Sequence, residues 1–253
     1  MAGEQRTMMS EVQALREFWE LRLDPMYRGR DMPRGDGRQV LVLPALFASD
    51  FYLEPIRAWL RRIGYTPRVS MLLINAGCPQ RLMEQVERTF AARDTGEAPV
   101  AIIGHSRGGM LGKAIATRLG ARCSHFIALG SPVGAVVRAG RAGLAAMGDP
   151  ERGEITPLQS IASPEVVEAG RRALRLFDPD CDMPACGCSY IEDLLAPLDP
   201  ATKAWSIYTR DDQVVSPDSC LIDGATNIEV SGTHSGLVFS KLVYPHIAEA
   251  LCA

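Results

Sequence analysis

The sequence predicts an α/β protein with a mostly parallel sheet flanked by helices, and three observations support this class. Short apolar segments alternate with amphipathic segments of roughly 10–15 residues, the pattern of strand–helix–strand units. The chain has 253 residues, 47% of them hydrophobic and 23% charged, which suits one globular domain over residues 1–253. Ser106 stands at a glycine-rich junction between a predicted strand and a predicted helix.

Periodicity and turn residues place the individual elements. Leu53, Ile56 and Leu60 share one helical face, and Gly64 ends that helix. Strands are expected at 39–43, 66–73, 100–103, 124–129, 204–208 and 227–230. Helices are expected at 10–23, up to 63, at 79–93, after 106, and at 133–147, 164–177 and 236–251.

Two segments lie outside this alternation. Residues 1–37 are expected to form an N-terminal helix and a polar linker. Residues 132–200 interrupt the rhythm after the strand that follows the Ser106 helix, so we expect a cap insertion over the carboxyl ends of the strands. Its apolar residues could contact a bound ligand or pack the cap against the rest of the domain. They are Val133, Val136, Val137, Leu144 and Met147.

Composition narrows the range of partners. A net charge of −3 and a pI near 5.9 argue against a nucleic-acid partner, which would favour a basic surface. No apolar run approaches the roughly 18 residues of a membrane helix, so no integral membrane contact is expected. The first residues, MAGEQRTMMS, lack the apolar stretch of a signal peptide, which predicts a cytoplasmic protein.

The segment around Ser106 carries the clearest chemical signal. The apolar run 100–103 leads into Gly104-His105-Ser106-Arg107-Gly108-Gly109, and a small-residue helical pattern follows. A G-x-S-x-G turn between strand and helix forces strained dihedrals on the serine and needs glycines where backbones approach closely. The Arg107 amide, at the helix N-terminus, is predicted to point at an oxyanion formed on Ser106.

A carboxylate and a histidine follow at the ends of later strands. Asp211 and Asp212 come just after strand 204–208, and His234 stands in a Gly/Ser/Thr loop after strand 227–230. An imidazole can accept the proton of a serine hydroxyl, while a buried carboxylate fixes the imidazole tautomer. The other histidines are His105, His125 and His246, and structural roles are expected for them.

With these pieces assembled, residues 37–251 resemble the esterase/lipase branch of the α/β-hydrolase superfamily. The matching segments are VLVLPALFASD (40–50), GHSRGG (104–109), ALGSP (128–132), DQVVSP (212–217) and GTHSG (232–236). The resemblance implies the α/β-hydrolase fold with Ser106 as nucleophile and His234 as base. In the family the acid commonly precedes an x-Val/Ile-Val pattern. Gln213-Val214-Val215 fits this pattern, so the resemblance implies Asp212 rather than Asp211 as the acid.

The resemblance also implies an oxyanion hole made by the backbone N–H groups of Leu46 and Arg107. Two departures from the family pattern bear on this region. Pro44-Ala45 stands where the family often has His-Gly, so the backbone near Leu46 has less freedom. Val133 stands where the family often has histidine, which affects the acyl pocket rather than the catalytic residues.

The implied function is that of a serine hydrolase acting on small-molecule esters, with no cofactor and no metal. The expected cap is polar and lacks a long apolar face, which favours short to medium acyl chains over oil surfaces. Acyl transfer and thioester cleavage use the same acyl-enzyme and stay open as alternatives. A non-catalytic binding protein with this fold is a further alternative, which the order Ser, Asp, His disfavours.

Four of the seven cysteines fall in two nearby loops. We expect a disulfide between Cys220 and one of Cys181, Cys186 and Cys188, which would tie the cap to the loop after Asp212. A four-thiolate zinc site and free thiols are the alternatives. The spacing differs from the paired C-x-x-C of common structural zinc sites.

Overall fold

The computed structural model describes residues 16–94, 96, 98–146, 164–181 and 188–253. Its centre is one six-stranded sheet with the strand order β2-β1-β3-β4-β5-β6, in which every neighbouring pair is parallel. The strands are β1 (Gln39–Leu43), β2 (Thr66–Val69), β3 (Val100–His105), β4 (Cys123–Leu129), β5 (Lys203–Tyr208) and β6 (Thr226–Glu229). The predicted parallel sheet and all its expected strands are therefore confirmed.

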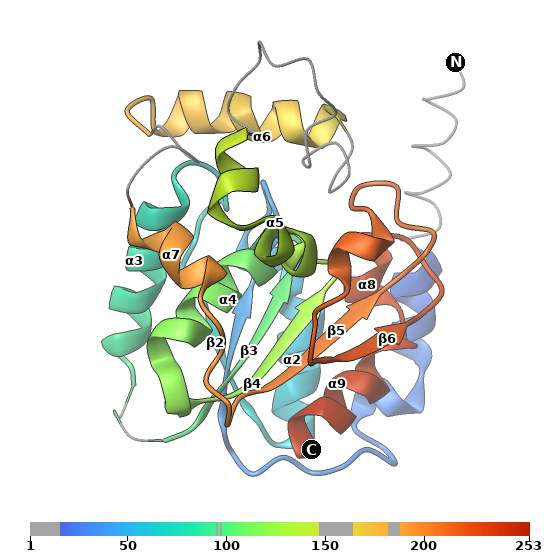
Figure 1. Ribbon diagram of the computed structural model, residues 1–253. Helices are drawn as coiled ribbons and strands as arrows, with labels where there is room; N and C mark the ends of the chain where they lie inside the picture. Colours follow the sequence, from blue (N-terminus) through green and yellow to red (C-terminus); the bar gives the residue numbers. More distant parts are fainter. Residues whose placement is uncertain (1–15, 95, 97, 147–163, 182–187) are drawn as a thin grey trace, which may run out of the picture.

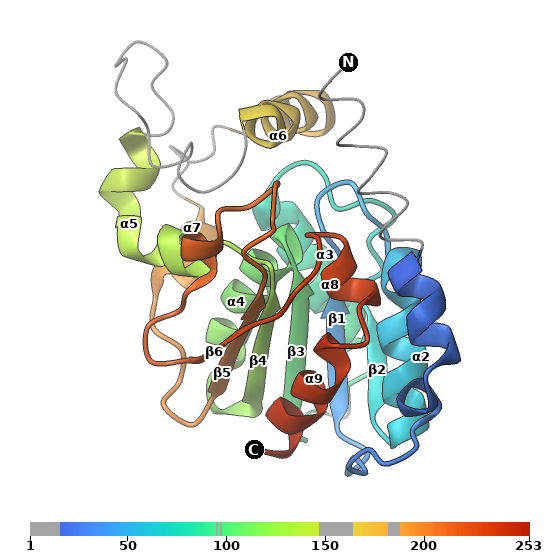
Figure 2. The same cartoon turned by 90° about the vertical axis from the view of Figure 1, so that its right-hand side faces the viewer.

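Helices cover both faces of the sheet, as Figures 1 and 2 show. One face carries α3 (Pro79–Ala91), α4 (Arg107–Leu119) and α7 (Ser189–Leu195). The other carries the helix at 16–23, α2 (Glu54–Ile63), α8 (Gly236–Phe239) and α9 (Val243–Cys252). Within β1, Val40 and Val42 pack in the second layer while Leu41 and Leu43 pack in the first, as strand alternation requires.

Strand β2 ends at Val69, four residues before its predicted end at Leu73. The carboxylate of Asp50 accepts hydrogen bonds from the backbone N–H groups of Ser70 and Met71. Met71 also has a left-handed backbone, with φ of 60°, which is incompatible with an extended strand. A distant side chain therefore ends this strand.

The predicted closing helix at 236–251 is two helices, α8 and α9, separated by an extended Ser240. Pro245 explains the break. In one continuous helix its ring would clash with the preceding turn and one hydrogen bond would be lost. With the break at Ser240, Pro245 falls in the first turn of α9, where its missing N–H costs nothing.

The segment 132–200 is divided between two places. It contains α5 (Val133–Ala146), α6 (Pro164–Phe177) and α7. Helix α6 lies beyond the carboxyl ends of the strands in both views (Figures 1 and 2). Helix α7 instead packs beside α4, where the Lys113 ammonium donates to the carbonyl oxygens of Asp193 and Ala196 at its C-terminal end. Only part of the segment expected to form a cap therefore lies above the strands.

Among the described residues, no helix is long and apolar enough to cross a membrane.

The start of α4 is pressed against the end of β1. A Cβ atom at Gly108 would lie 2.3 Å from the carbonyl oxygen of Leu43 and 2.5 Å from that of Pro44. Both neighbours are backbone atoms, so neither can move without shifting a strand or a helix. By contrast, the nearest atom to a Cβ at Gly170 in α6 is Leu46 Cδ2, at 3.9 Å.

We therefore predict that Gly108→Ala lowers the free energy of unfolding by about 1–3 kcal/mol, as overpacking does. Gly170→Ala, the matched control, should raise it by up to about 1 kcal/mol because alanine favours a helix over glycine. Urea unfolding of both variants measures the difference. Equal effects of the two substitutions would contradict the steric argument.

Candidate active site

Ser106 occupies the turn between β3 and α4 with φ of 54° and ψ of −122°. Such a backbone costs a non-glycine residue about 1–3 kcal/mol and persists only where the surroundings impose it. A Cβ at Gly104 would lie 2.5 Å from backbone atoms of Gly108 and Gly109, so the flanking glycine is a steric requirement. The strand, G-x-S-x-G turn and helix are present as the sequence predicts.

His234 is hydrogen-bonded to Asp212. Its Nδ1 lies 2.6 Å from Asp212 Oδ2, and the Asp212 side chain is only 1% exposed. The other carboxylate oxygen accepts the backbone N–H groups of Val214 and Val215, each at 2.8 Å. These two amides fix the orientation of the carboxylate. Asp211, in contrast, is exposed, so the structure pairs the histidine with Asp212.

Ser106 and His234 both line one cavity of about 1170 Å³. Its other walls are largely apolar and come from the helix at 16–23, the loop after β1, α2, α6 and α8. The aromatic lining residues are Phe18, Tyr27, Phe47, Phe51, Tyr52 and Phe239. Helix α6 contributes Glu165 and Ala169 to the lining.

None of residues 133–140, the part of α5 whose side chains the structure describes, lines this cavity. Val133 and Val136 are buried in the layer that contains α4, so they pack the segment on the body, the second of the two interpretations left open by the sequence. The side chain of Leu144 and all of Met147 lie outside the described residues.

The buried side chain of His105 contacts His234. Its Nε2 lies 3.0 Å from the carbonyl oxygen of His234, and the two ring centroids are 4.8 Å apart. Burial, with a smaller contribution from the neighbouring His234, lowers the pKa of His105 to about 3. The ring is therefore neutral near pH 7 and can donate from Nε2 to that carbonyl. The sequence predicted only a structural role here, since nothing in it shows this contact.

The candidate oxyanion donors come from the loop after β1 and from the start of α4. The Arg107 amide is the first of α4 and has no partner within the helix. In the loop, the amide of Phe47 donates to Asn75 O at 3.0 Å and that of Ala48 to Ala45 O at 3.1 Å. The Leu46 amide makes no backbone hydrogen bond in the described part of the chain, and Leu46 lines the cavity beside Ser106.

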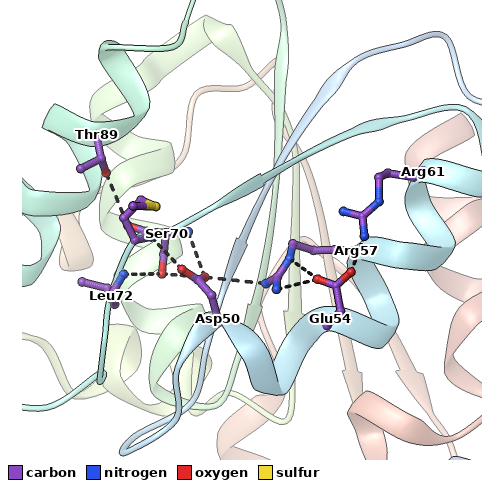
Figure 3. Close-up of polar contacts among 8 residues, drawn as sticks. Asp50, Glu54, Arg57, Arg61, Ser70, Leu72 and Thr89 are labelled. Atoms are coloured by element: carbon purple, nitrogen blue, oxygen red, sulfur yellow. Dashed lines mark hydrogen bonds and ion pairs between the residues drawn. The ribbon is translucent and has the colours of Figure 1, made fainter.

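Asp50 anchors the far end of this loop (Figure 3). Its Oδ1 accepts the amide and the hydroxyl of Ser70, both at 2.9 Å, and its Oδ2 accepts the Met71 amide at 2.7 Å. Buried Arg57 lies 3.7 Å from Asp50 and is held by Glu54 at 2.8 Å. The loop after β1 is thereby fixed to the segment after β2. Sequence analysis did not single out Asp50 for this role.

The expected disulfide to Cys220 is not formed, because Cys220 carries a free thiol. It ends the short helix η4 (Pro217–Cys220) and packs with Tyr208 and Val215, fully buried. Burial raises the pKa of this thiol to about 12. The loop after Asp212 thus turns Cys220 into an apolar cluster, away from Cys181 and Cys188. Cys186 lies outside the described residues.

Among the residues that the structure describes, no group of three or more His, Cys, Asp and Glu side chains could hold a metal ion. The proposed zinc ligand Cys186 is outside that set.

Comparisons with known proteins bear on the fold. No protein-family model and no curated protein matches the sequence. An α/β superfamily hydrolase from Oenococcus oeni PSU-1 is 16% identical with a TM-score of 0.55, over 87% of this chain and 94% of that one. Polyneuridine aldehyde esterase is 14% identical with a TM-score of 0.51, over 86% and 98% of the two chains.

A structure from the metagenome-derived lipolytic enzymes LipS and LipT is 14% identical, with a TM-score of 0.56 over 87% of this chain and 96% of that one. At such identities the likeness establishes the fold alone. The chain has the α/β-hydrolase fold, as the sequence predicts.

The geometry predicts that Asp212→Asn lowers kcat by about 10⁴-fold for any reaction in which His234 accepts the Ser106 proton, because an amide favours the wrong tautomer of His234. Asp211→Asn is the matched control, and its exposed carboxylate predicts a change of less than about two-fold. Steady-state kinetics on both variants decides. A larger loss from Asp211→Asn would assign the acid to that residue.

The low pKa of His105 predicts an acid-sensitive fold. As pH falls below about 6.5, His105 in the unfolded chain binds a proton, whereas His105 in the folded protein does not bind one until about pH 3. The free energy of unfolding therefore decreases between these two pH values. His105→Gln can still donate to the His234 carbonyl but does not titrate. Urea unfolding from pH 7 to pH 4 should show a smaller loss in the variant, by up to about 3 kcal/mol. Parallel curves would contradict this.

Proposed function

We propose that the chain is a serine hydrolase that cleaves carboxylic esters of short to medium acyl chains through Ser106, His234 and Asp212. One observation supports this most: a histidine bonded to a buried carboxylate shares a cavity with a serine held in a strained strand-to-helix turn. A histidine that only supported the fold would not need a carboxylate fixed by two backbone amides.

In the proposed reaction, Asp212 holds the proton of His234 on Nδ1, which leaves Nε2 free to accept the Ser106 proton. The serine oxygen then attacks the ester carbonyl. The amides of Arg107 and Leu46 donate to the oxyanion of the tetrahedral intermediate. His234 returns its proton to the leaving alcohol, and water repeats the sequence to release the acid.

The cavity supports an apolar acyl group. Its walls are mainly aromatic and aliphatic, and its volume of about 1170 Å³ is slightly above the usual range for small-molecule sites. The preference for short to medium chains rests on the polarity expected for segment 132–200, in which the outer helix α6 carries Arg171, Arg172 and Arg175. Thioesters and acyl acceptors other than water would use the same acyl-enzyme.

Labelling with a fluorophosphonate probe, followed by a p-nitrophenyl ester series of increasing chain length, tests the proposal. Ser106→Ala should abolish labelling and lower turnover by roughly 10⁴–10⁶-fold while leaving the unfolding transition in place. Ser235→Ala removes another serine that lines the cavity and should keep both signals.

Retention of more than a tenth of the activity in Ser106→Ala would sink the assignment. Rates that rise steadily to C16 esters would overturn the chain-length preference. Product analysis with an added alcohol or a thioester substrate separates hydrolysis from acyl transfer and thioester cleavage.

A further inference from the structure

Asn75 lies between the two segments that carry the candidate oxyanion donors. It belongs to the loop between β2 and α3, and it is fully buried. Its side-chain Nδ2 donates to the carbonyl oxygen of Pro44 at 2.6 Å. Its Oδ1 accepts a hydrogen bond from Nη1 of Arg107 at 3.2 Å. One amide side chain therefore connects the loop after β1 to the first residue of α4.

The backbone of Asn75 repeats the connection. Its N–H donates to Ala48 O at 2.9 Å, and its carbonyl oxygen accepts from the Phe47 amide at 3.0 Å and from Arg107 Nη1 at 3.1 Å. The partners fix the orientation of the side-chain amide, since a carbonyl can only accept and a guanidinium can only donate. A flipped amide would lose both side-chain contacts.

These hydrogen bonds hold the chain both before and after Leu46. Pro44 precedes it, and Phe47 and Ala48 follow it, and each is bonded to Asn75. Phe47 is held with φ of 61°, a left-handed conformation that a bulky residue keeps only when its surroundings impose it. With its neighbours fixed, the Leu46 amide has one available direction.

The second donor is fixed from the same residue. Arg107 carries the other candidate amide, and its guanidinium also donates to Gly77 O through Nη2 at 2.5 Å. The side chain is half-buried, and burial lowers the pKa of its guanidinium from the ordinary arginine value. The guanidinium donates hydrogen bonds to the backbone carbonyl oxygens of Asn75 and Gly77 and to the side-chain oxygen Oδ1 of Asn75.

We propose that Asn75 is a positioning residue that sets the separation of the two oxyanion donors, the amides of Leu46 and Arg107. The inference rests on the proposed function. Asn75 does not line the cavity, so it acts through these two residues rather than by touching substrate. Loosening one donor by about 1 Å can cost on the order of 10²-fold in rate.

Asn227 provides a matched control. Its amide also ties a loop together, since Oδ1 accepts the Ile222 amide at 2.9 Å and Nδ2 donates to Ile222 O and Ala225 O at 3.0 and 3.1 Å. It lies at β6, outside the cavity lining. Asn227 is exposed, so Asn227→Ala reports the loss of three loop hydrogen bonds of an asparagine amide at a place where no donor depends on it.

The experiment measures kcat, KM and the inhibition constant of a trifluoromethyl ketone, which forms a tetrahedral oxyanion on the serine. Active sites are counted with the fluorophosphonate probe run to completion. For Asn75→Ala we expect kcat to fall by about 10–100-fold with KM within about two-fold. The inhibition constant of the ketone should rise by the same factor as kcat/KM falls. Asn227→Ala should leave all three within about two-fold.

Asn75→Asp keeps Oδ1 for Arg107 but cannot donate to Pro44 O, and it preserves the shape of the side chain. It should show a smaller loss of kcat with the same pattern, and it carries the test if Asn75→Ala does not fold.

Two results would overturn the assignment of Asn75 alone. One is an active wild type in which the Asn75 variants lose no more kcat per active site than Asn227→Ala. The other is a rise in KM with an unchanged affinity for the ketone. A wild type that neither labels nor turns over esters would overturn the proposed function, and the role of Asn75 with it.

Discussion

The tight turn at Ser106 is the constraint on which the rest of the site depends. Only Ser106 separates the end of β3 from the start of α4, so the first turn of α4 lies against the end of β1 and only glycine fits at Gly108. The first amide of α4, that of Arg107, directly follows Ser106, which lines the cavity. Packing and the proposed chemistry thus meet at this edge, because the close approach that excludes a Cβ at Gly108 joins the start of α4 to the loop that contains Leu46.

Several polar groups around this turn are buried and have defined partners, although His105 Nδ1 and Ser131 Oγ have none. Asp212 is held by two amides and His234, His105 by a carbonyl oxygen, and Asn75 by contacts on both of its amide atoms. Burial makes a misplaced polar group costly, so each side chain has one favourable orientation. Orientation by satisfied hydrogen bonds is what a preorganised site requires, since groups that are already aligned need no rearrangement during reaction.

Much of this arrangement follows from local sequence. Apolar runs and turn residues predicted the sheet, and position after a strand predicted Ser106, His234 and an acid at Asp211 or Asp212. The family resemblance then favoured Asp212. Pro245 was a visible signal for the break between α8 and α9. Asn75 and Asp50 had no such signal, because their partners lie about 20–30 residues away and their residue types are common in loops. The position of Cys220 likewise depended on how its loop turns inward, which cysteine spacing does not encode.

Ser106, Phe47 and Met71 are non-glycine residues with a positive φ. Each lies within a few residues of the carboxyl end of a strand: β3, β1 and β2, respectively. Three of the four described non-glycine residues with a positive φ thus lie where the chemistry is proposed, and the fourth, Asp31, lies in the linker before β1. This separates two routes for adapting the protein. Changes at the amino-terminal edge can accumulate stability without cost to the site. Relieving strain at the carboxyl edge would gain stability but would release the loops that hold the site in shape. Evolution toward heat resistance and evolution toward new substrates would therefore act on different ends of the same strands.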